Sequence, residues 1–427
     1  MNKKILEIFP EGWDLIPSNK FCERVTDGTH DTPKPKSEGM YLLTSKNIKN
    51  GNIVYETAYK ISIDDYNSIN KRSRVDQWDV LFSMIGTVGE VAIVKDKPKF
   101  AIKNIGLFKC GNKTKGRWLY YFLTSSTGKK ILDTYLTGTS QQFVSLGDLR
   151  QIPIICPPLP IQEKIAAVLS AYDELIENNN RRIAILEKMA EEIYREWFVR
   201  MRFPGHEKVK FHKGLPEGWE LVDILNAFDF TGGGTPAKDV EKYWNNGDIN
   251  WYTPSDITSA KGIYLFSSSV KCNEDGLRNS SAKIFPPYSI MMTSRATIGT
   301  LGINTTYACT NQGFITCIPN EKYPLVFLYH WLKLNKSYFE VLSSGATFSE
   351  LIKSTFKKIK ILTPPKNTIK NFQTLVDPIF KSIEKTLEKI FLLKKSRDLL
   401  LPRLISGKLS VEKLDIKFPP GMEETNA

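Results

Sequence analysis

The sequence predicts an α+β protein made of two similar globular halves, each followed by a long helix. Three observations support this fold class. Short motifs recur along the 427 residues at a nearly constant offset of 206 to 210 positions. A Pro-Pro pair closes each globular half, and a stretch with heptad spacing follows each pair. The chain is also too long for one ordinary core, which favours two or three domains.

The repeat is visible in matched motifs. Pro-Glu-Gly-Trp opens one copy at Pro10 and the other at Pro216. The other matched segments are 86–93 with 296–303, Asn104 with Asn311, 138–140 with 345–347, and 149–158 with 356–365. This is one large duplication and not a solenoid of short repeats. Two similar folded units should follow, related by an approximate two-fold axis within one chain.

Each globular half mixes strand and helix signals. Residues 80–84 and 90–94 predict strands around a glycine turn, and residues 290–292 and 301–303 are their counterparts. Residues 118–123 and 324–334 predict helices. Each half is therefore expected to be an α+β globule of about 150 residues. Trp13 and Trp219, at the start of strands, are expected to be packing residues.

The two heptad stretches predict long helices that pack on each other. Their apolar seam includes Leu169, Ile176, Ile183 and Ile193 in the first helix and Val376, Ile383, Ile390 and Leu400 in the second. A polar residue interrupts both seams at the same place, Asn179 and Thr386. Two surface helices packed only on their own globules are the alternative. Pro378 predicts a restart or kink in the second helix, and Pro402 a kink or an end.

These signals divide the chain into five segments. They are a first globular domain at 1–158, a first spacer helix at 159–200, a linker with the second globular domain at 201–366, a second spacer helix at 367–405, and a C-terminal tail at 406–427.

The composition points to a nucleic-acid partner. Lys and Arg number 59 against 46 Asp and Glu, a formal charge of +13, which suits a polyanion. No run of 18 apolar residues is present, and an acidic residue at position 7 argues against a secretory signal. Six cysteines without a CxxC pair favour reduced thiols. We therefore expect a cytoplasmic protein with no membrane contact.

Catalytic and metal-binding motifs are missing. The four histidines form no HExxH pattern, and neither a phosphate-binding P-loop nor a GxSxG elbow occurs. We therefore predict no catalytic residue, no metal site and no bound cofactor. Residues 229–235 and 285–288 resemble the cofactor loop and catalytic motif of adenine methyltransferases. Phe285 stands where that chemistry needs Asn or Asp, and Pro236 follows the glycines. A self-contained methyltransferase is therefore a weak alternative.

Several motifs together resemble the DNA-specificity subunit of type I restriction–modification systems, over essentially the whole chain. They are the Pro-Glu-Gly-Trp openings, Pro157–Gln162 at the start of the first helix, Asp173–Ile176 within it, and Leu404–Leu409 closing the second helix. The second helix departs from the pattern at its start, where Asn367-Thr368-Ile369 replaces the Pro-Ile-Gln of the first.

The resemblance implies a function. Each globule would be a target-recognition domain reading one half of a bipartite DNA site, joined by two long antiparallel coiled-coil helices that set the spacing. The partners would be double-stranded DNA, two modification subunits that methylate adenine N6, and possibly two restriction subunits. The chain itself would bind no cofactor. The complex would use S-adenosylmethionine, with ATP and Mg²⁺ where a restriction subunit is present.

A stand-alone architectural or regulatory DNA-binding protein is the second reading. Such a protein should leave no apolar strip on the outer face of its helices. Leu175, Phe198, Phe391 and Leu392 lie off the seam. They favour contacts with partner subunits.

Candidate DNA contacts are polar residues on loops, because base edges are read by hydrogen bonds. In the first globule they are Thr29, His30, Lys34 and Lys36 of one loop, and Thr139, Ser140, Gln141 and Gln142 of another. Lys46, Asn47, Arg72 and Arg74 are expected to contact phosphate or to lie at the surface. The second globule offers Thr231, Thr235, Ser294, Arg295, Thr347 and Ser349, of which Arg295 suits guanine.

Overall fold

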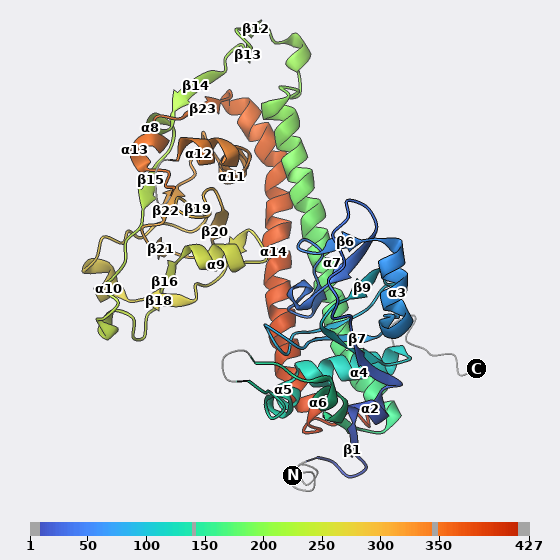
Figure 1. Cartoon of the computed structure of the whole chain (residues 1–427). Helices are drawn as coiled ribbons and strands as arrows, with labels where there is room; N and C mark the ends of the chain where they lie inside the picture. The colour runs from blue at the N-terminus through green and yellow to red at the C-terminus, as the bar shows by residue number, and fades with distance from the viewer. Residues whose placement is uncertain (1–8, 139–141, 344–348, 417–427) are drawn as a thin grey trace. The chain divides into compact units, whose positions relative to one another are not determined.

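The computed structural model describes residues 9–138, 142–343 and 349–416, and it divides into two compact units (Figure 1). Unit 1 comprises Met1–Glu177 with Phe391–Ala427, and unit 2 comprises Asn178–Ile390. Each unit contains one globular half together with a part of both long helices. The α+β class predicted from the sequence is confirmed.

Unit 1 is built around a four-stranded antiparallel sheet in the order β2-β10-β7-β8. Its strands are β2 (Arg24–Asp27), β10 (Ile105–Lys109), β7 (Val80–Ser83) and β8 (Val91–Ile93). A second sheet has the order β6-β3-β9, with β6 (Tyr59–Ile61), β3 (Met40–Leu43) and β9 (Phe100–Ile102). Two strand pairs complete the unit, β1 (Asp14–Pro17) with β11 (Pro153–Cys156), and β4 (Ile48–Lys49) with β5 (Asn52–Ile53).

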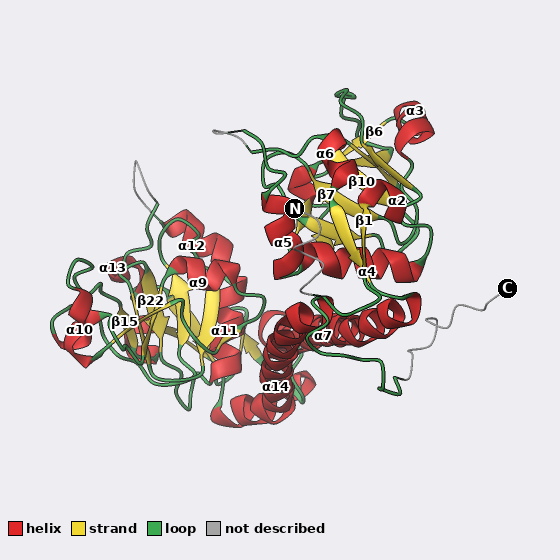
Figure 2. Ribbon diagram, turned by 90° about the horizontal axis from the view of Figure 1, so that it is seen from below, coloured by secondary structure: helices red, strands yellow, loops and turns green. Residues whose placement is uncertain are grey.

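The globular helices of unit 1 lie beside these sheets (Figure 2). They are α2 (Ser18–Phe21), α3 (Ile63–Ser73), α4 (Lys113–Thr124), α5 (Ser126–Asp133) and α6 (Leu146–Gln151). The predicted strands around the glycine turn and the predicted helix at 118–123 are confirmed as β7, β8 and α4.

Unit 2 repeats this plan with an added strand. Its main sheet has the order β15-β22-β19-β20-β17, with β15 (Phe230–Gly232), β22 (Phe314–Cys317), β19 (Ile290–Thr293), β20 (Leu301–Asn304) and β17 (Tyr264–Leu265). The second sheet is β18 (Val270–Cys272), β16 (Ile249–Tyr252) and β21 (Ala308–Thr310). The strand pairs are β14 (Glu220–Asp223) with β23 (Lys360–Thr363), and β12 (Phe211–His212) with β13 (Leu215–Pro216).

The globular helices of unit 2 include the one predicted at 324–334, which is confirmed. They are α8 (Ile224–Ala227), α9 (Pro254–Ser259), α10 (Glu274–Arg278), α11 (Leu325–Leu334), α12 (Lys336–Leu342) and α13 (Lys353–Phe356).

Helix α7 (Leu159–Tyr194) continues into a π-helical turn at Arg195–Val199, and α14 spans Lys366–Ile405. Helix α14 passes through Pro378 and Pro402 without a break, so it neither restarts at the first proline nor ends at the second, and of the predicted alternatives only a kink is left at each. A proline removes one backbone hydrogen bond from a helix. Beyond Pro402, Leu404 and Ile405 are buried in the core of unit 1, and this packing offsets the loss.

Within each unit the two helix segments run antiparallel. In unit 1, Leu169 of α7 shares a buried cluster with Leu404 of α14, while Asp173, further along α7, pairs with the earlier Arg397. In unit 2, Tyr194 near the end of α7 contacts Phe372 near the start of α14.

The seam residues differ in burial. Six of the eight are buried, namely Leu169, Ile176, Ile183, Val376, Ile383 and Ile390. Ile193 and Leu400 are only half-buried. Next to Ile193, Tyr194 is buried instead, because it faces the aromatic rings of α11 and α14.

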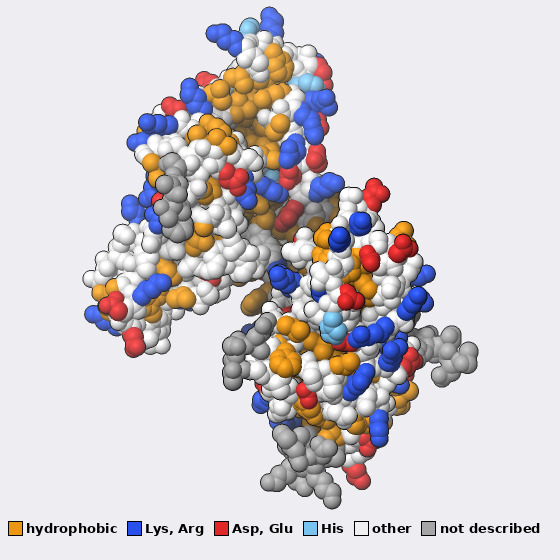
Figure 3. Space-filling view, viewed as in Figure 1, with side chains coloured by type: hydrophobic (Ala, Val, Ile, Leu, Met, Phe, Trp, Pro, Cys, Tyr) orange, Lys and Arg blue, Asp and Glu red, His pale blue; other side chains and the backbone are white. Residues whose placement is uncertain are grey.

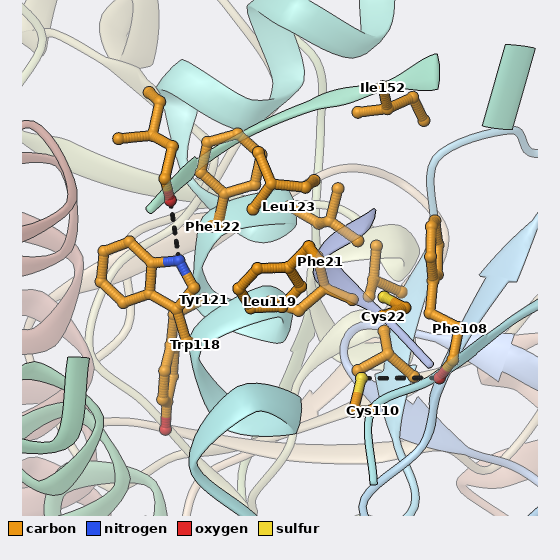
Figure 4. Close-up of a cluster of buried hydrophobic side chains, with 14 of the residues drawn as sticks. Phe21, Cys22, Phe108, Cys110, Trp118, Leu119, Tyr121, Phe122, Leu123 and Ile152 are labelled. Atoms are coloured by element: carbon orange, nitrogen blue, oxygen red, sulfur yellow. Dashed lines mark hydrogen bonds between the residues drawn. The ribbon is translucent and has the colours of Figure 1, made fainter. Parts of the chain in front are cut away.

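The core of unit 1 is rich in aromatic side chains (Figure 4). Trp118 is fully buried, and its indole N–H donates to the Ile155 carbonyl oxygen at 2.9 Å. Trp13 packs edge-on against Trp118, with ring centroids 6.1 Å apart. In unit 2 the equivalent Trp219 stacks near Phe203 at 5.0 Å. Both motif tryptophans are therefore packing residues, as predicted.

Candidate nucleic-acid interface

The same turn joins the central hairpin in each unit. In unit 1 the Ser83 hydroxyl accepts from the backbone N–H of Glu90 at 2.9 Å. In unit 2 the Thr293 hydroxyl accepts from the N–H of Thr300 at 3.0 Å. The two turns therefore match residue for residue at an offset of 210. This match makes Ile85 and Arg295 equivalent positions.

A second segment lies beside this turn in the same way in both units. The N–H of Val144 donates to the Met84 carbonyl at 3.1 Å, and the N–H of Leu351 donates to the Ser294 carbonyl at 3.0 Å. Isolated β-bridges then pair Ile85 with Phe143 and Arg295 with Glu350. Phe143 and Glu350 are therefore equivalent as well.

A third segment follows β2 in unit 1 and β15 in unit 2. The N–H of Thr29 donates to the Ile102 carbonyl at 3.0 Å, and the N–H of Gly234 donates to the Thr310 carbonyl at 2.8 Å. The next residue in each unit makes a similar side-chain contact. His30 Nδ1 lies 2.8 Å from Asn104 Oδ1.

In unit 2 the Thr235 hydroxyl donates to Gln312 Oε1 at 2.7 Å. Asn104 and Gln312 therefore occupy the same place in the two units. The sequence repeat had matched Asn104 with Asn311 instead. That match is wrong by one residue: the N–H of Asn311 donates to Tyr252 as the N–H of Lys103 donates to Leu43, so Asn311 corresponds to Lys103.

These three segments form one frame that carries different side chains in the two units. In unit 1 the frame surrounds a hollow of about 240 Å³. The lining includes Asp27, His30, Ile85, Asn104 and Phe143. At the equivalent positions unit 2 carries Gly232, Thr235, Arg295, Gln312 and Glu350. A shared backbone frame with unlike side chains suits two surfaces that bind chemically different targets.

A buried carboxylate organises the surface of unit 1. Asp27 Oδ2 lies 3.0 Å from His30 Nε2, and Asp27 Oδ1 pairs with Arg72. The His30 ring is thus held at both nitrogens, by Asp27 and by Asn104. The Arg72 side chain is half exposed, so a cation stands at the rim of the hollow.

An ion pair organises the surface of unit 2. Arg295 Nε lies 2.9 Å from the Glu350 carboxylate, and the Arg295 side chain is 46% exposed. The carboxylate fixes the plane of the guanidinium, which is the geometry that bidentate recognition requires.

The remaining candidates are spread over the surface. Lys34, Lys36, Lys46, Arg74, Gln142 and Ser349 are exposed, and Thr29 and Thr231 are half-buried. Arg74 pairs with Asp76 at 3.2 Å. Thr139, Ser140, Gln141 and Thr347 lie outside the described residues.

Two predicted contact residues are buried, which corrects the prediction. Asn47 is 1% exposed, and its side chain accepts from the Thr44 N–H at 2.8 Å and donates to the Val54 carbonyl at 2.9 Å. It caps a short turn, as Asp256 does after Thr253 in unit 2. Ser294 is 2% exposed beneath the Arg295 turn.

Phe198 also departs from its prediction as an outward-facing partner contact. It is buried among Trp219, Phe327 and Phe372, with ring centroids at 5.9, 4.8 and 4.9 Å.

Sequence reasoning missed Asn104, Gln312, Ile85, Phe143 and Glu350 as members of the surface. Asn104 belonged to a repeated motif, and this was a usable signal. Gln312 follows Asn311 in the counterpart of that motif, and the other three residues, Ile85, Phe143 and Glu350, carry no motif. Their proximity depends on β-bridges between segments that are distant in the sequence.

The methyltransferase-like motifs have structural roles. A Cβ on Gly233 would lie 2.1 Å from the Thr310 carbonyl oxygen, so this position needs glycine for close backbone packing. Phe285 is buried, and the Tyr288 hydroxyl bonds to Glu384 at 3.2 Å. Within residues 9–138, 142–343 and 349–416 no cluster of three metal-binding side chains occurs, and no helix is long and apolar enough to cross a membrane.

Known proteins share this organisation. The sequence model of the type I restriction modification DNA specificity domain matches the chain twice, at residues 10–188 and 216–392. The specificity subunit of the type I restriction enzyme MjaIX from Methanocaldococcus jannaschii is 28% identical over 423 residues, which is 95% of both chains. The EcoR124I/EcoR124II specificity subunit from Escherichia coli is 24% identical over 65% of this chain and 68% of its own.

A solved structure agrees with these relatives. The S subunit of a type I restriction-modification system from M. genitalium shares the fold with a TM-score of 0.57 at 17% identity, over 92% of this chain and 96% of that one. The two matches of the family model cover most of the sequence. The chain therefore belongs to the family of type I restriction–modification DNA specificity subunits.

Proposed function

We propose that each unit reads one half of a bipartite DNA site, and that the chain performs no chemistry itself. The observation that carries this proposal is the pair of equivalent surfaces with unlike side chains. One backbone frame presents His30 and Asn104 in unit 1, but Arg295 and Gln312 in unit 2. Unlike side chains at equivalent places predict two half-sites of different sequence.

The residues suit the parts of a duplex. Arg72 and Arg74, with the exposed Lys34 and Lys36, would contact phosphates around the unit 1 hollow. Arg295 would bind the O6 and N7 of a guanine with its guanidinium held by Glu350. Gln142, which is exposed next to the hollow, suits the N6 and N7 edge of adenine.

The outer faces of the long helices would dock modification subunits. Several large apolar side chains there are exposed, namely Leu175, Phe391, Leu392 and Leu399 in unit 1, and Ile185, Met189 and Leu375 in unit 2. A stand-alone architectural DNA-binding protein, the second candidate, would gain nothing from these exposed side chains. Apolar contact area on a helix is typical of a protein interface.

The chemistry would lie in the partners. Two modification subunits would bring S-adenosylmethionine and methylate adenine N6 after flipping the base out of the duplex. Restriction subunits, possibly two, would add ATP- and Mg²⁺-dependent steps. This chain would bind none of these cofactors.

The two helices would also set the distance between half-sites. Helix α7 has 36 residues and α14 has 40, and each contributes residues to both units. At 1.5 Å per residue α7 is roughly 54 Å long. If the pair acts as a spacer, the two reading surfaces would be kept apart by the helix length, and the bases between them would be unspecified.

The test is a genome-wide map of methylated adenines in cells with and without this gene. The expected result is one asymmetric bipartite motif that disappears without the gene. His30→Ala should relax one half of the motif, and Arg295→Ala should relax the other. Arg278→Ala is the matched control, because Arg278 is an exposed arginine that is also ion-paired, to Glu274. A variant that relaxes both halves, or an unchanged methylation map, would contradict the proposal.

A further inference from the structure

Two large apolar side chains stand exposed at the edge of the unit 1 hollow. Ile85 is 41% exposed and Phe143 is 42% exposed, although both line the hollow beside His30 and Asn104. Exposed apolar side chains also lie close to Lys and Arg side chains on this face of unit 1 (Figure 3). Apolar surface is therefore exposed beside the polar side chains of His30, Asn104 and Arg72.

The backbone holds this pair in place. The Thr137 N–H donates to the Phe143 carbonyl oxygen at 3.0 Å, and the Phe143 N–H donates to the Thr137 carbonyl oxygen at 2.9 Å. The Thr137 hydroxyl donates to the Phe143 carbonyl at 3.1 Å, and a β-bridge joins Phe143 to Ile85. The next residue, Val144, bonds to Met84 and is buried. The exposure of the two side chains is therefore part of a hydrogen-bonded arrangement.

The equivalent positions in unit 2 show that this bridge does not require apolar side chains. There Arg295 and Glu350 occupy the same bridge and form an ion pair. The frame thus accepts polar side chains at both positions. The apolar pair is therefore a feature of unit 1 and not of the frame that the two units share.

We propose that Ile85 and Phe143 contact the C5-methyl group of a thymine in the half-site read by unit 1. This inference rests on the proposed function. The thymine methyl is the apolar group that base pairs present in the major groove. Asn104, in the same hollow, carries an amide of the kind that reads adenine in that groove. Apolar and amide groups side by side match the major-groove edges of A·T base pairs.

The experiment removes only the methyl group. The full chain is assembled with its modification subunit, and its affinity is measured for duplexes carrying the mapped site. Each thymine of both half-sites is replaced, one at a time, by deoxyuridine. We expect a thymine in one half-site to be sensitive, with binding weakened about fourfold, the value of one buried methyl group.

Two variants connect that loss to the proposed residues. Phe143→Ala and Ile85→Ala should each reduce the difference between the thymine and deoxyuridine duplexes, while the other half-site is read as before. Phe211→Ala is the matched control, because Phe211 is 48% exposed on the β12–β13 hairpin, outside the frame. That variant should keep the full fourfold difference. Both test positions are exposed, so thermal unfolding should show folded proteins.

Several outcomes would overturn the inference. One is a set of affinities that does not respond to any replacement, and another is a pair of variants that keeps the full sensitivity. A Phe143→Ala protein that instead loses the same amount of affinity for the thymine and the deoxyuridine duplex would keep the fourfold ratio. That result would indicate that the Phe143 ring inserts between bases and does not contact the methyl group. If the assembly with the wild-type chain binds the mapped site no better than other duplexes, the proposed function itself is refuted. That result differs from site-specific binding that does not respond to the methyl group.

Discussion

His330 is a buried histidine whose replacement should stabilise unit 2. It lies in α11 with 1% exposure, between the rings of Tyr194, Tyr329 and Phe380 at centroid distances of 5.5, 5.4 and 5.7 Å. Neither ring nitrogen has a hydrogen-bond partner among the residues that the structure describes. Burial, together with the charge of the nearby Lys333, lowers the pKa of His330 from 6.5 to about 3.

Both features destabilise the fold relative to an apolar side chain. An unsatisfied buried polar group costs about 1–3 kcal/mol. His330→Leu removes two such nitrogens with little change in volume, so we expect the free energy of unfolding at pH 7.5 to rise by about 1–3 kcal/mol. Strain from the change of shape would reduce this gain, and we do not expect it to reverse the sign.

The pH dependence has a defined direction. Above pH 6.5 the imidazole is neutral in both the folded and the unfolded chain, so His330 adds no pH dependence. Between pH 6.5 and about 3 the unfolded chain binds a proton that the folded chain excludes. Stability therefore falls with falling pH, by up to tenfold in the folding equilibrium constant per pH unit. His330→Leu should remove this contribution from the acid limb.

The measurement is chemical unfolding of the full chain followed by tryptophan fluorescence, from pH 7.5 to pH 4.5. His212→Leu is the matched control, because His212 is exposed on the β12–β13 hairpin, and it should leave the acid limb unchanged. A His330→Leu protein that is less stable at pH 7.5 and equally sensitive to acid would refute the reasoning. That result would mean that His330 has a polar partner in solution.

Four further predictions concern a capping residue, a buried ion pair, the salt dependence of DNA binding and the spacing of the half-sites. Asn47→Ala should lower the free energy of unfolding by about 1 kcal/mol through loss of its cap and leave DNA affinity unchanged, as tested by unfolding and binding of one preparation. Asp173→Asn and Arg397→Met should be coupled by about 1–2 kcal/mol in a double-mutant cycle, because the pair lies at 2.6 Å and is mostly buried. Affinity for non-cognate duplex should fall linearly on a log–log plot between about 50 and 200 mM salt. Four residues inserted after Asn179 should lengthen the unspecified spacer by about two base pairs, roughly 6 Å, in a variant verified to fold.

The sequence repeat predicts the frame well, because the frame is built from local elements. The Ser83 turn and the Thr293 turn recur with the same hydrogen bonds, and their glycines and flanking apolar residues are visible as motifs. The heptad spacing likewise places Ile176 and Ile383 on buried faces. These features depend on residues that are close together in the chain.

The surface was less predictable, because it joins segments that are distant in sequence. The offset between equivalent residues is 205 for His30 and Thr235, 208 for Asn104 and Gln312, and 210 for Ile85 and Arg295. Unit 2 is five residues longer than unit 1 between His30 and Ile85 and two residues shorter between Ile85 and Asn104. The strands shift as well, from 205 for Asp27 and Gly232 to 210 for Ser83 and Thr293, so no single offset pairs the two units throughout. Polar residue type alone also misplaced Asn47, since capping uses the same amide as base reading.

On the proposed function, the frame would allow two copies of one duplicated fold to read different sequences. Its segments are joined by backbone hydrogen bonds, such as Val144 to Met84 and Leu351 to Ser294, which impose little constraint on side chains. Ile85 can therefore correspond to Arg295 without loss of the bridge. An apolar residue at this position favours a thymine methyl group, and an arginine favours guanine. Exchange of side chains at this bridge should alter the recognised bases while the fold is preserved.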